Sequence, residues 1–403
     1  METMNIARPI DTARVEDKPA AWGAVVALAL SAFALIASEF LPVSLLTPVA
    51  ASLAISEGRA GQAIAISGAF ALVTSLVLPA LAGRFDRKLV LLALSFMMIV
   101  SGTVVACAPD FAVFMLGRAV LGVAIGGFWS LSAATAMRLV PAHQVPRALA
   151  ILNGGNALAT VVAAPLGSFL GAVVGWRGAF FCVVPLAAAA FLWKWCALPA
   201  LPAQQGASAG NVLRLLARPA VALGMAAVGL FFMGQFALFT YLRPFLEKVT
   251  GVDVSTLSVV LLMIGVAGVA GTSLIGRVLK GGLYRVLVAI PVLMAAIALL
   301  LIGVGSSLTF TSILLAGWGL VATAAPVGWW TWLARTLPRD AEAGGGLIVA
   351  VIQLAIMLGA TAGGLLFDHS GYQATFAASA AVLLASSGLA MLAGRAGRQH
   401  ERR

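Results

Sequence analysis

Charged residues are scarce in this sequence. Only 10% of its 403 residues are Asp, Glu, Lys or Arg, whereas soluble domains contain about 25%. Hydrophobic residues make up 62% of the chain, and the mean hydropathy is +1.05. A soluble protein of this size would need more charge to cover its surface. The composition therefore excludes a soluble enzyme, a nucleic-acid-binding protein and a disordered chain, and it predicts an all-α protein that crosses a lipid bilayer many times.

Histidine and cysteine offer little chemistry here. The three histidines, His143, His369 and His400, fall outside the apolar segments, and the three cysteines form no CxxC motif. The sequence has no P-loop for ATP and no cluster of His, Cys and carboxylates with the spacing of a metal site. A Ser-His-Asp site inside the membrane would lack its histidine. We therefore expect no enzymatic activity, no cofactor and no bound metal ion.

Long apolar segments follow one another along the chain. A bilayer core of about 30 Å needs about 20 apolar residues per helix, and this window predicts twelve spanning helices. Their predicted ranges are 22–45, 58–82, 88–107, 111–136, 148–171, 178–197, 220–242, 255–276, 285–304, 309–335, 345–366 and 373–394. The predicted organisation is an N-terminal tail (1–21), a six-helix bundle (22–197), a linker (198–219), a second six-helix bundle (220–394) and a C-terminal tail (395–403).

The basic residues favour one side of this arrangement. With the N-terminus inside, 20 of the 25 Lys and Arg, Lys194 among them, lie on the cytoplasmic side, four lie on the other side, and Arg118 alone lies within a span. This excess follows the positive-inside rule and predicts that both termini are cytoplasmic. Seven of the nine tryptophans lie near predicted span ends and are expected to form an interfacial belt: Trp22, Trp176, Trp193, Trp195, Trp329, Trp330 and Trp332.

The two halves of the chain resemble each other. Residues 175–180 read GWRGAF after the fifth predicted helix, and residues 371–376 read GYQATF after the eleventh. Gly-Arg pairs at 83–84 and 276–277 follow the second and eighth helices with a similar offset. Two parallel six-helix repeats are the architecture of major facilitator transporters.

Two ionisable residues lie inside the predicted spans. Glu39 is in the first helix and Arg118 is in the fourth, which runs the opposite way. At 1.5 Å per residue both lie about 7–9 Å outward of the midplane, so they could pair. A charge in this position costs about 2.5–3.5 kcal/mol and predicts a functional role. The alternative is a purely structural ion pair. If protons drive transport, Glu39 is the main carrier within the membrane, because no histidine lies there.

Polar side chains in three other predicted helices indicate a shared cavity. Four amides and one aromatic residue lie on these helices, with few charged residues near them. The predicted substrate-binding residues are Asn153, Asn156, Gln235, Phe239 and Gln353. For each amide alone, a hydrogen bond between helices is the competing interpretation. Together they predict a cavity that offers donors and acceptors to a neutral ligand.

Several motifs resemble the drug:proton antiporter branch of the major facilitator superfamily. Arg118, Gly122 and Gly126 resemble its arginine motif, and Pro165, Gly167 and Gly171 resemble its antiporter motif, although Ala164 stands where glycine usually precedes the proline. The loop at 83–88, with Gly83, Asp86 and Arg87, is a degenerate form of a third motif and lacks its later glycine. The resemblance implies gating and helix-packing roles for these residues.

Longer strings resemble the purine ribonucleoside exporters of that branch. These strings lie at 39–48, 55–58, 126–129, 138–141, 234–237 and 326–329. The resemblance implies export of purine ribonucleosides such as inosine and guanosine from bacteria, across the inner membrane and in exchange for protons. It also implies alternating access by a monomer, with Glu39 and Arg118 in proton coupling. The alternatives are a sugar or multidrug exporter of the same branch, or a membrane enzyme or passive channel.

Overall fold

The structure is a computed structural model that describes residues 20–82, 85–202, 212–337 and 340–401. Within these residues every regular element is a helix, and eleven helices are long and apolar enough to cross a membrane. The first half contains α1 (Trp22–Ser52), α2 (Glu57–Ala82), α3 (Arg87–Ala106), α4 (Phe111–Arg138), η1 (Ala142–Gln144), α5 (Val145–Val173), α6 (Gly175–Phe181) and α7 (Val183–Ala197). After η2 (Val212–Ala217), the second half contains α8 (Pro219–Phe239), α9 (Leu242–Phe245), η3 (Leu246–Thr250), α10 (Val254–Leu279), α11 (Leu283–Val304), α12 (Leu308–Thr336) and α13 (Ala341–Glu401).

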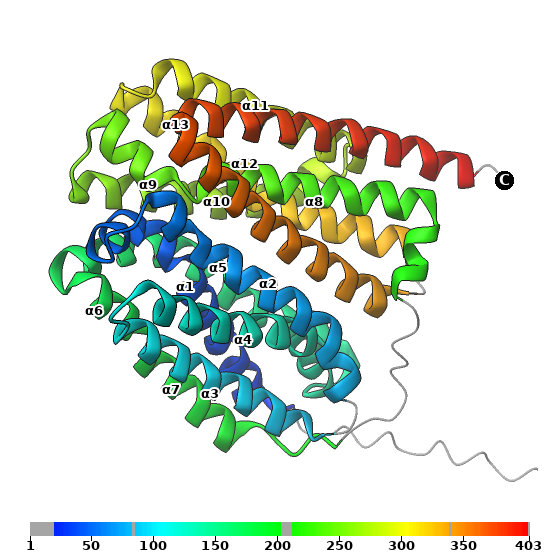
Figure 1. Ribbon diagram of the computed structural model, residues 1–403. Helices are drawn as coiled ribbons and strands as arrows, with labels where there is room; N and C mark the ends of the chain where they lie inside the picture. Colours follow the sequence, from blue (N-terminus) through cyan, green and yellow to red (C-terminus); the bar gives the residue numbers. More distant parts are fainter. Residues whose placement is uncertain (1–19, 83–84, 203–211, 338–339, 402–403) are drawn as a thin grey trace, which may run out of the picture.

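The twelfth span is contained in α13, which is 61 residues long. Gly371 interrupts it with a φ of 79°, a left-handed conformation that glycine adopts without steric cost. The chain turns back there, so the orange and red parts of α13 run in opposite directions (Figure 1). The predicted fold of twelve helices in two six-helix bundles is therefore confirmed.

Several helix boundaries differ from the predicted ones. Helix α1 continues through Pro42 and Pro48 to Ser52, past the predicted end at 45. Cys182 separates α6 from α7 within the predicted span 178–197, and α13 continues to Glu401 through most of the predicted tail. Five stretches lie outside the described residues: 1–19, 83–84, 203–211, 338–339 and 402–403. Gly83 of the predicted loop motif is among them.

Aspartates begin three of the helices. The Asp110 side chain accepts a hydrogen bond from Val113 N–H at the start of α4, and Asp253 caps α10 in the same way. Hydrogen bonds from Ser255 and Thr256 lower the pKa of Asp253 to about 2. Such caps satisfy N–H groups that have no partner within the helix.

Asp86 also ties the linker to α3. Its side chain caps α3 through Lys88 N–H at 2.7 Å and accepts a second hydrogen bond from Leu201 N–H at 3.1 Å. The N–H of Arg87 donates to Leu201 O at 3.0 Å. The predicted loop motif therefore contacts the chain just after α7.

Lys194 corrects the count of charges within the spans. Its side chain is fully buried, donates to the Ser95 hydroxyl and lies 3.5 Å from Leu91 O on α3. Its ammonium group is also 6.0 Å from the ring centre of Phe128. The expectation that Arg118 is the only basic residue inside a span was wrong, because polar atoms of α3 provide a second site for a cation.

The tryptophan belt is also only partly present. Trp176, Trp329 and Trp332 are buried within the two halves, and Trp332 packs against Gly224 of α8. Trp193 and Trp195, on α7, are exposed as expected. Position along a span does not say which side of a helix faces the bundle, so the prediction failed for the three that face inward.

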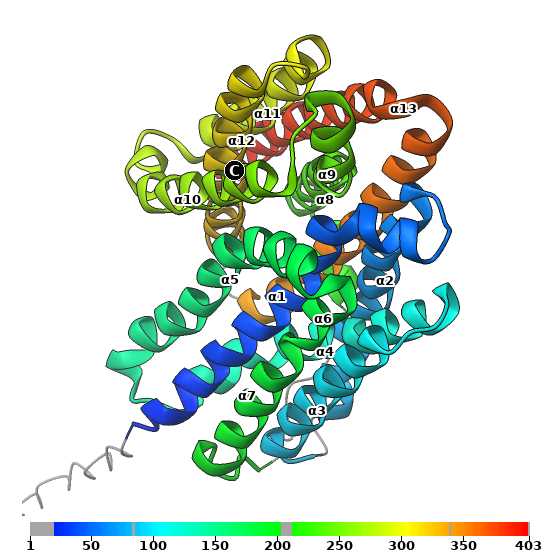
Figure 2. The same cartoon turned by 90° about the vertical axis from the view of Figure 1, so that its left-hand side faces the viewer.

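The two halves meet at one end of the molecule. The first residue of α1 and the last residue of α13 lie at the opposite end. We call the end where the halves meet the closed end and the other the terminal end. In Figure 2, which looks onto the closed end, α8 to α13 lie above α1 to α7. Asp368 of α13 accepts hydrogen bonds there from Ser56 and from Gly58 N–H, the latter at 2.9 Å. Lys248 forms an ion pair with Glu57 at 2.6 Å.

The halves diverge toward the terminal end. Near mid-span, Gly265 of α10 lies directly against the backbone of Val161 in α5. Farther toward the terminal end, a methyl group added to Gly154 of α5, Gly276 of α10 or Gly346 of α13 would meet no atom within 4 Å. The interface between the halves is therefore tight at the closed end and open at the terminal end.

Neighbouring glycines of α5 test the packing within the first half. A methyl group at Gly155 would collide with Ala29 O of α1, whereas one at Gly154 would meet nothing. We expect Gly155→Val to lower thermal stability by about 1–3 kcal/mol, because overpacking forces the helices apart. Thermal unfolding of the purified protein measures this, with Gly154→Val as the matched control. Equal stability of the two variants would contradict the packing described here.

Candidate functional site

Two prolines of α1 leave two backbone carbonyls without their usual helical donors. Proline has no N–H, so the carbonyl four residues before it has no partner in the helix. Pro42 removes the donor for Ser38 O, and Pro48 removes the donor for Ser44 O. Arg118 binds Ser38 O at 2.7 Å, and Arg243 of α9 binds Ser44 O. Each exposed carbonyl thus receives an arginine, the first from the same half and the second from the other half.

Arg118 is fully buried and joins three helices. Besides Ser38 O, it donates to Ala63 O at 3.1 Å and to the Ser67 hydroxyl at 3.2 Å, both on α2. Its contact with Glu39 is to the backbone oxygen, at 3.4 Å. No nitrogen of Arg118 lies within 4.0 Å of the Glu39 carboxylate, so the two side chains are close without forming a direct ion pair.

Glu39 connects the two halves instead. Glu39 is 6% exposed, and its carboxyl group lies close to the side chain of Gln353 on α13. Gln353 is buried as well, and its Oε1 has no hydrogen-bond partner. A buried carboxyl group needs such a partner or must be protonated. The carboxyl of one half therefore lies beside an amide of the other half.

Glycines bring α4 and α5 close enough for these contacts. Gly122 and Gly126 of the predicted arginine motif lie directly against Ser67 O and Ala71 O of α2. Gly167 and Gly171 of the predicted antiporter motif lie against side chains of α1, and Pro165 is within α5 without ending it. The motifs thus place α4 against α2 and α5 against α1.

A cavity of about 70 Å³ lies between the halves near mid-span. Its lining includes two of the predicted residues, Gln235 and Phe239, and no charged side chain. The lining residues are Phe40, Thr160, Ala164, Gln235, Phe236, Phe239, Leu261, Ile264, Gly265, Trp318, Gly319, Ala322 and Thr323. Small-molecule sites usually have about 300–1,000 Å³, so the halves must separate further before a drug-sized or nucleoside-sized ligand fits.

Aromatic side chains dominate this central cavity. Phe40 and Phe236 stack across the two halves with ring centres 6.1 Å apart and an angle of 18°. Phe239 meets Phe40 edge-on at 6.3 Å. Trp318 Nε1 and Gln235 Oε1 are buried without a hydrogen-bond partner. The cavity therefore combines stacking faces with unpaired polar groups of Trp318 and Gln235.

The other predicted amides lie outside this lining. Asn153 is exposed and donates to Leu149 O of its own helix at 2.9 Å. Asn156 is one turn before Thr160, whose hydroxyl donates to Asn156 O at 2.9 Å. Gln353 faces Glu39 as described. The amides on α5, α8 and α13 therefore lie at different depths along the interface between the halves, and they do not line a single cavity.

Sequence reasoning missed Trp318, Phe40 and Phe236. Trp318 is one of the two tryptophans outside the span-end group, and a polar N–H in mid-span was a signal that could have identified it. Phe40 follows Glu39 directly, so its placement was implicit in the motif. Nothing in the sequence distinguishes Phe236 from the other phenylalanines of α8.

The fold and this site define a membrane transporter of two six-helix halves with a central cavity. The sequence matches the Major Facilitator Superfamily over residues 28–347. The chain belongs to this superfamily.

Two relatives resemble the chain over nearly its full length. It is 60% identical over 393 residues to the "Transcription regulatory protein OpdE" of Pseudomonas aeruginosa, covering 96% of this chain and 98% of that one. It is 42% identical over 363 residues to the "Purine ribonucleoside efflux pump NepI" of Salmonella paratyphi B, covering 90% and 91%. The predicted resemblance to the purine ribonucleoside exporters is therefore confirmed.

Solved structures agree with the fold. A bacterial homologue of the human lysosomal transporter Spinster, in an inward-facing and unoccupied conformation, superposes with a TM-score of 0.78 at 17% identity, covering 94% of this chain and 98% of that one. The human organic anion transporter MFSD10 superposes with a TM-score of 0.64 at 20% identity, covering 93% and 100%.

The prolines of α1 provide a test of the link between the halves. Pro48→Ala supplies an N–H that competes with Arg243 for Ser44 O. We expect it to raise the population opened at the closed end by roughly tenfold, since a hydrogen bond to a charged group is weakened. Spin labels on α2 and α13 at the closed end measure the change in distance.

Pro42→Ala is the matched control. The new backbone N–H would restore the helical hydrogen bond to Ser38 O. The arginine that binds Ser38 O is Arg118, which belongs to the same half as α1. Its effect on the closed end should be small. Equal opening in both variants would show that helix stiffness, rather than the Arg243 contact, controls this end.

Proposed function

We propose that this transporter exports purine ribonucleosides such as inosine and guanosine in exchange for protons. The observation that carries the proposal is the 42% identity to a purine ribonucleoside efflux pump over 90% of the chain. The central cavity supports it on chemical grounds. Its lining is uncharged and aromatic, which suits a neutral ligand with a planar base. The free groups of Trp318 and Gln235 would hydrogen-bond the polar edge of that base.

Glu39 is the proton-binding group in this proposal. It is buried between the halves, near Arg118 of the first half and beside Gln353 of the second half. Rocking of the halves around the central site would separate Glu39 from Gln353. Loss of that partner favours the protonated carboxyl, whereas proximity of Arg118 favours the ionised one. The membrane potential can drive such a cycle, because each charge moved across 100 mV is worth about 2.3 kcal/mol.

The proposed location is the bacterial inner membrane, with both termini in the cytoplasm. The excess of basic residues at the terminal end supports this orientation. The closed end then faces outward, and the described conformation is open to the cytoplasm. The proposed unit is a monomer, with the central cavity formed by one chain.

The regulatory name of the 60% identical relative is compatible with transport. A transporter changes transcription when it changes the internal concentration of an inducer or repressor. Transport-inactive variants distinguish this route from direct regulation. If Glu39→Gln abolishes both nucleoside export and the effect on transcription, regulation follows from transport.

The amides of the interface are expected to control substrate preference. Gln235→Ala, Gln353→Ala and Asn156→Ala each remove a group that can hydrogen-bond a buried ligand. Such a loss costs about 1–3 kcal/mol, or roughly 5- to 150-fold in affinity. Export of labelled inosine against arabinose and a cationic drug measures both affinity and class of substrate. Gln373→Ala, an exposed amide, is the control. Wild-type inosine export by all three variants would leave the amides with structural roles only.

Glu39→Gln is expected to separate binding from coupling. It preserves the shape of the side chain and removes the titrating group, so nucleoside binding and downhill exchange should persist. Uphill export and its pH dependence should be lost. Proteoliposomes with and without an imposed pH gradient measure both processes.

Asp253→Asn is the control for Glu39→Gln. The pKa of Asp253 is about 2, and a lowered carboxyl pKa means that Asp253 stays ionised as the pH falls to that value. Its loss should leave pH dependence between pH 5 and 8 unchanged. Uphill export by Glu39→Gln at the wild-type rate would place proton coupling on another residue.

A further inference from the structure

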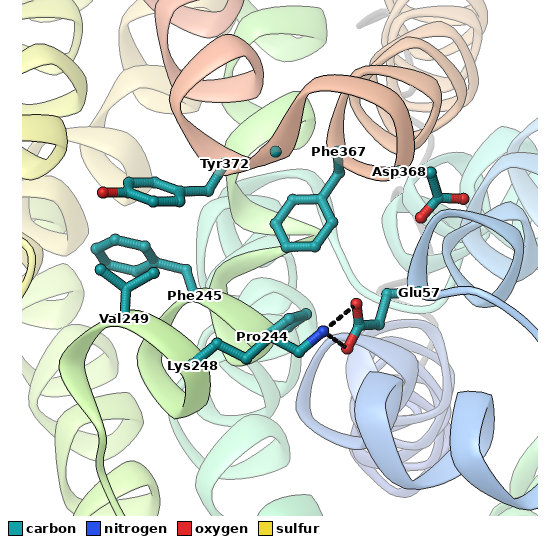
Figure 3. A pocket seen from close by; sticks show the side chains of 9 residues that line it. Glu57, Pro244, Phe245, Lys248, Val249, Phe367, Asp368 and Tyr372 are labelled. Carbon is teal, nitrogen blue, oxygen red and sulfur yellow. Dashed lines mark hydrogen bonds and ion pairs between the residues drawn. The ribbon is translucent and has the colours of Figure 1, made fainter.

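A second cavity lies at the closed end, apart from the central one (Figure 3). Its volume is about 340 Å³, within the usual range for small-molecule sites. Glu57 of α2 belongs to the first half, and the other lining residues come from the second half. The cavity therefore exists in this form only while the halves are joined at this end.

One side of this closed-end pocket consists of hydrogen-bond acceptors. The Glu57 carboxylate holds Lys248, and the Asp368 carboxylate accepts from Ser56 and from Gly58 N–H. A carboxylate has about four acceptor positions, so both retain capacity for a ligand. A ligand must therefore supply donors such as hydroxyl groups. Two carboxylates against one ammonium group also disfavour an anion.

The other side of the pocket is aromatic. Phe245 and Tyr372 pack with ring centres 5.3 Å apart, and Figure 3 shows the Phe367 ring between them and the carboxylates. Phe367 stacks on Tyr241 at 5.2 Å, which fixes its orientation. Phe245 itself is fully buried, so the rings of the half-buried Phe367 and Tyr372 are the faces on which a planar heterocycle can stack.

We propose that the closed-end pocket binds the exported ribonucleoside after it leaves the central cavity. The base packs against the aromatic side, and the ribose hydroxyls donate to Asp368 and Glu57. This inference rests on the proposed function, because it takes the same class of substrate. Nucleotides are excluded by their phosphate charge.

Binding there has a consequence for transport. A ligand that contacts both halves stabilises the joined state of this end. Nucleoside accumulating outside the cell therefore slows further export by holding the closed end shut. Export thus becomes sensitive to the external concentration of its own product.

Equilibrium binding of labelled inosine to the full-length protein in lipid nanodiscs tests the pocket directly. Gln235→Ala/Phe239→Ala removes two residues of the central-cavity lining and should retain inosine binding at the closed-end pocket. Adding Tyr372→Leu should abolish that binding, whereas adding Tyr372→Phe, which keeps the ring, should not. Neither change touches the contacts of Asp368 and Lys248 that join the halves.

A ligand lacking the ribose diol tests the acceptor side. In the Gln235→Ala/Phe239→Ala background, 2′,3′-dideoxyinosine should bind about tenfold more weakly than inosine, and inosine 5′-monophosphate should not bind measurably. Asp368→Asn should remove most of the preference for inosine over the dideoxy compound. In export assays, Tyr372→Leu should raise the external inosine concentration needed for half-inhibition by about tenfold, and Tyr372→Phe should not.

Three results would overturn the proposal, and they differ in what they say about the proposed function. If the wild type binds inosine and the central double variant does not, nucleoside export stands and the closed-end site is wrong. If the double variant binds inosine equally with and without Tyr372→Leu, the second site lies elsewhere. If no form binds a nucleoside, both proposals are wrong, and Tyr372-dependent binding of benzyltrimethylammonium would then identify the pocket as a cation site.

Discussion

The structure depends on how the backbone carbonyls of α1 are satisfied. Inside a bilayer no water replaces a missing hydrogen bond, so each freed carbonyl needs a donor from the protein. Pro42 and Pro48 free two carbonyls on one helix, and Arg118 and Arg243 take them. The first contact belongs to the fixed interior of one half. The second crosses between halves, so opening the closed end must break a hydrogen bond of a buried charge.

The burial of Arg118 depends on the close packing of α4 against α2. Arg118 reaches Ala63 O and Ser67 on α2 only because Gly122 and Gly126 let α4 approach α2 closely. Larger residues at these glycines would separate the helices and leave the guanidinium without acceptors. The glycine spacing after Arg118 is therefore a condition for burying the arginine.

Sequence reasoning predicted the features that depend on composition and period. Spans, repeats and the number of helices followed from apolar length, and Glu39 was identified because a carboxyl in a span is rare. The rest needed three-dimensional contacts. Glu39 lies beside Gln353, which is 314 positions away in the chain, and no local pattern links the two residues. Lys194 was assigned to the cytoplasmic side because sequence position cannot reveal that the Ser95 hydroxyl and Leu91 O accept hydrogen bonds from its ammonium group. Trp332 was expected at a lipid interface, since helix orientation is invisible in a nearly uniform apolar segment.

Lys194 has a consequence for the biogenesis of the first half. In an isolated α7 this ammonium group, in the last turn of the helix, would enter lipid at a cost below the roughly 2.5–3.5 kcal/mol of a helix centre. The cost falls when α3 is already present, because Ser95 and Leu91 O then accept hydrogen bonds from the lysine. Helix α3 leaves the ribosome before α7, so its acceptors are available when α7 reaches the translocon. Membrane insertion of α7 is thereby coupled to tertiary contacts with an earlier helix rather than to its own hydrophobicity alone.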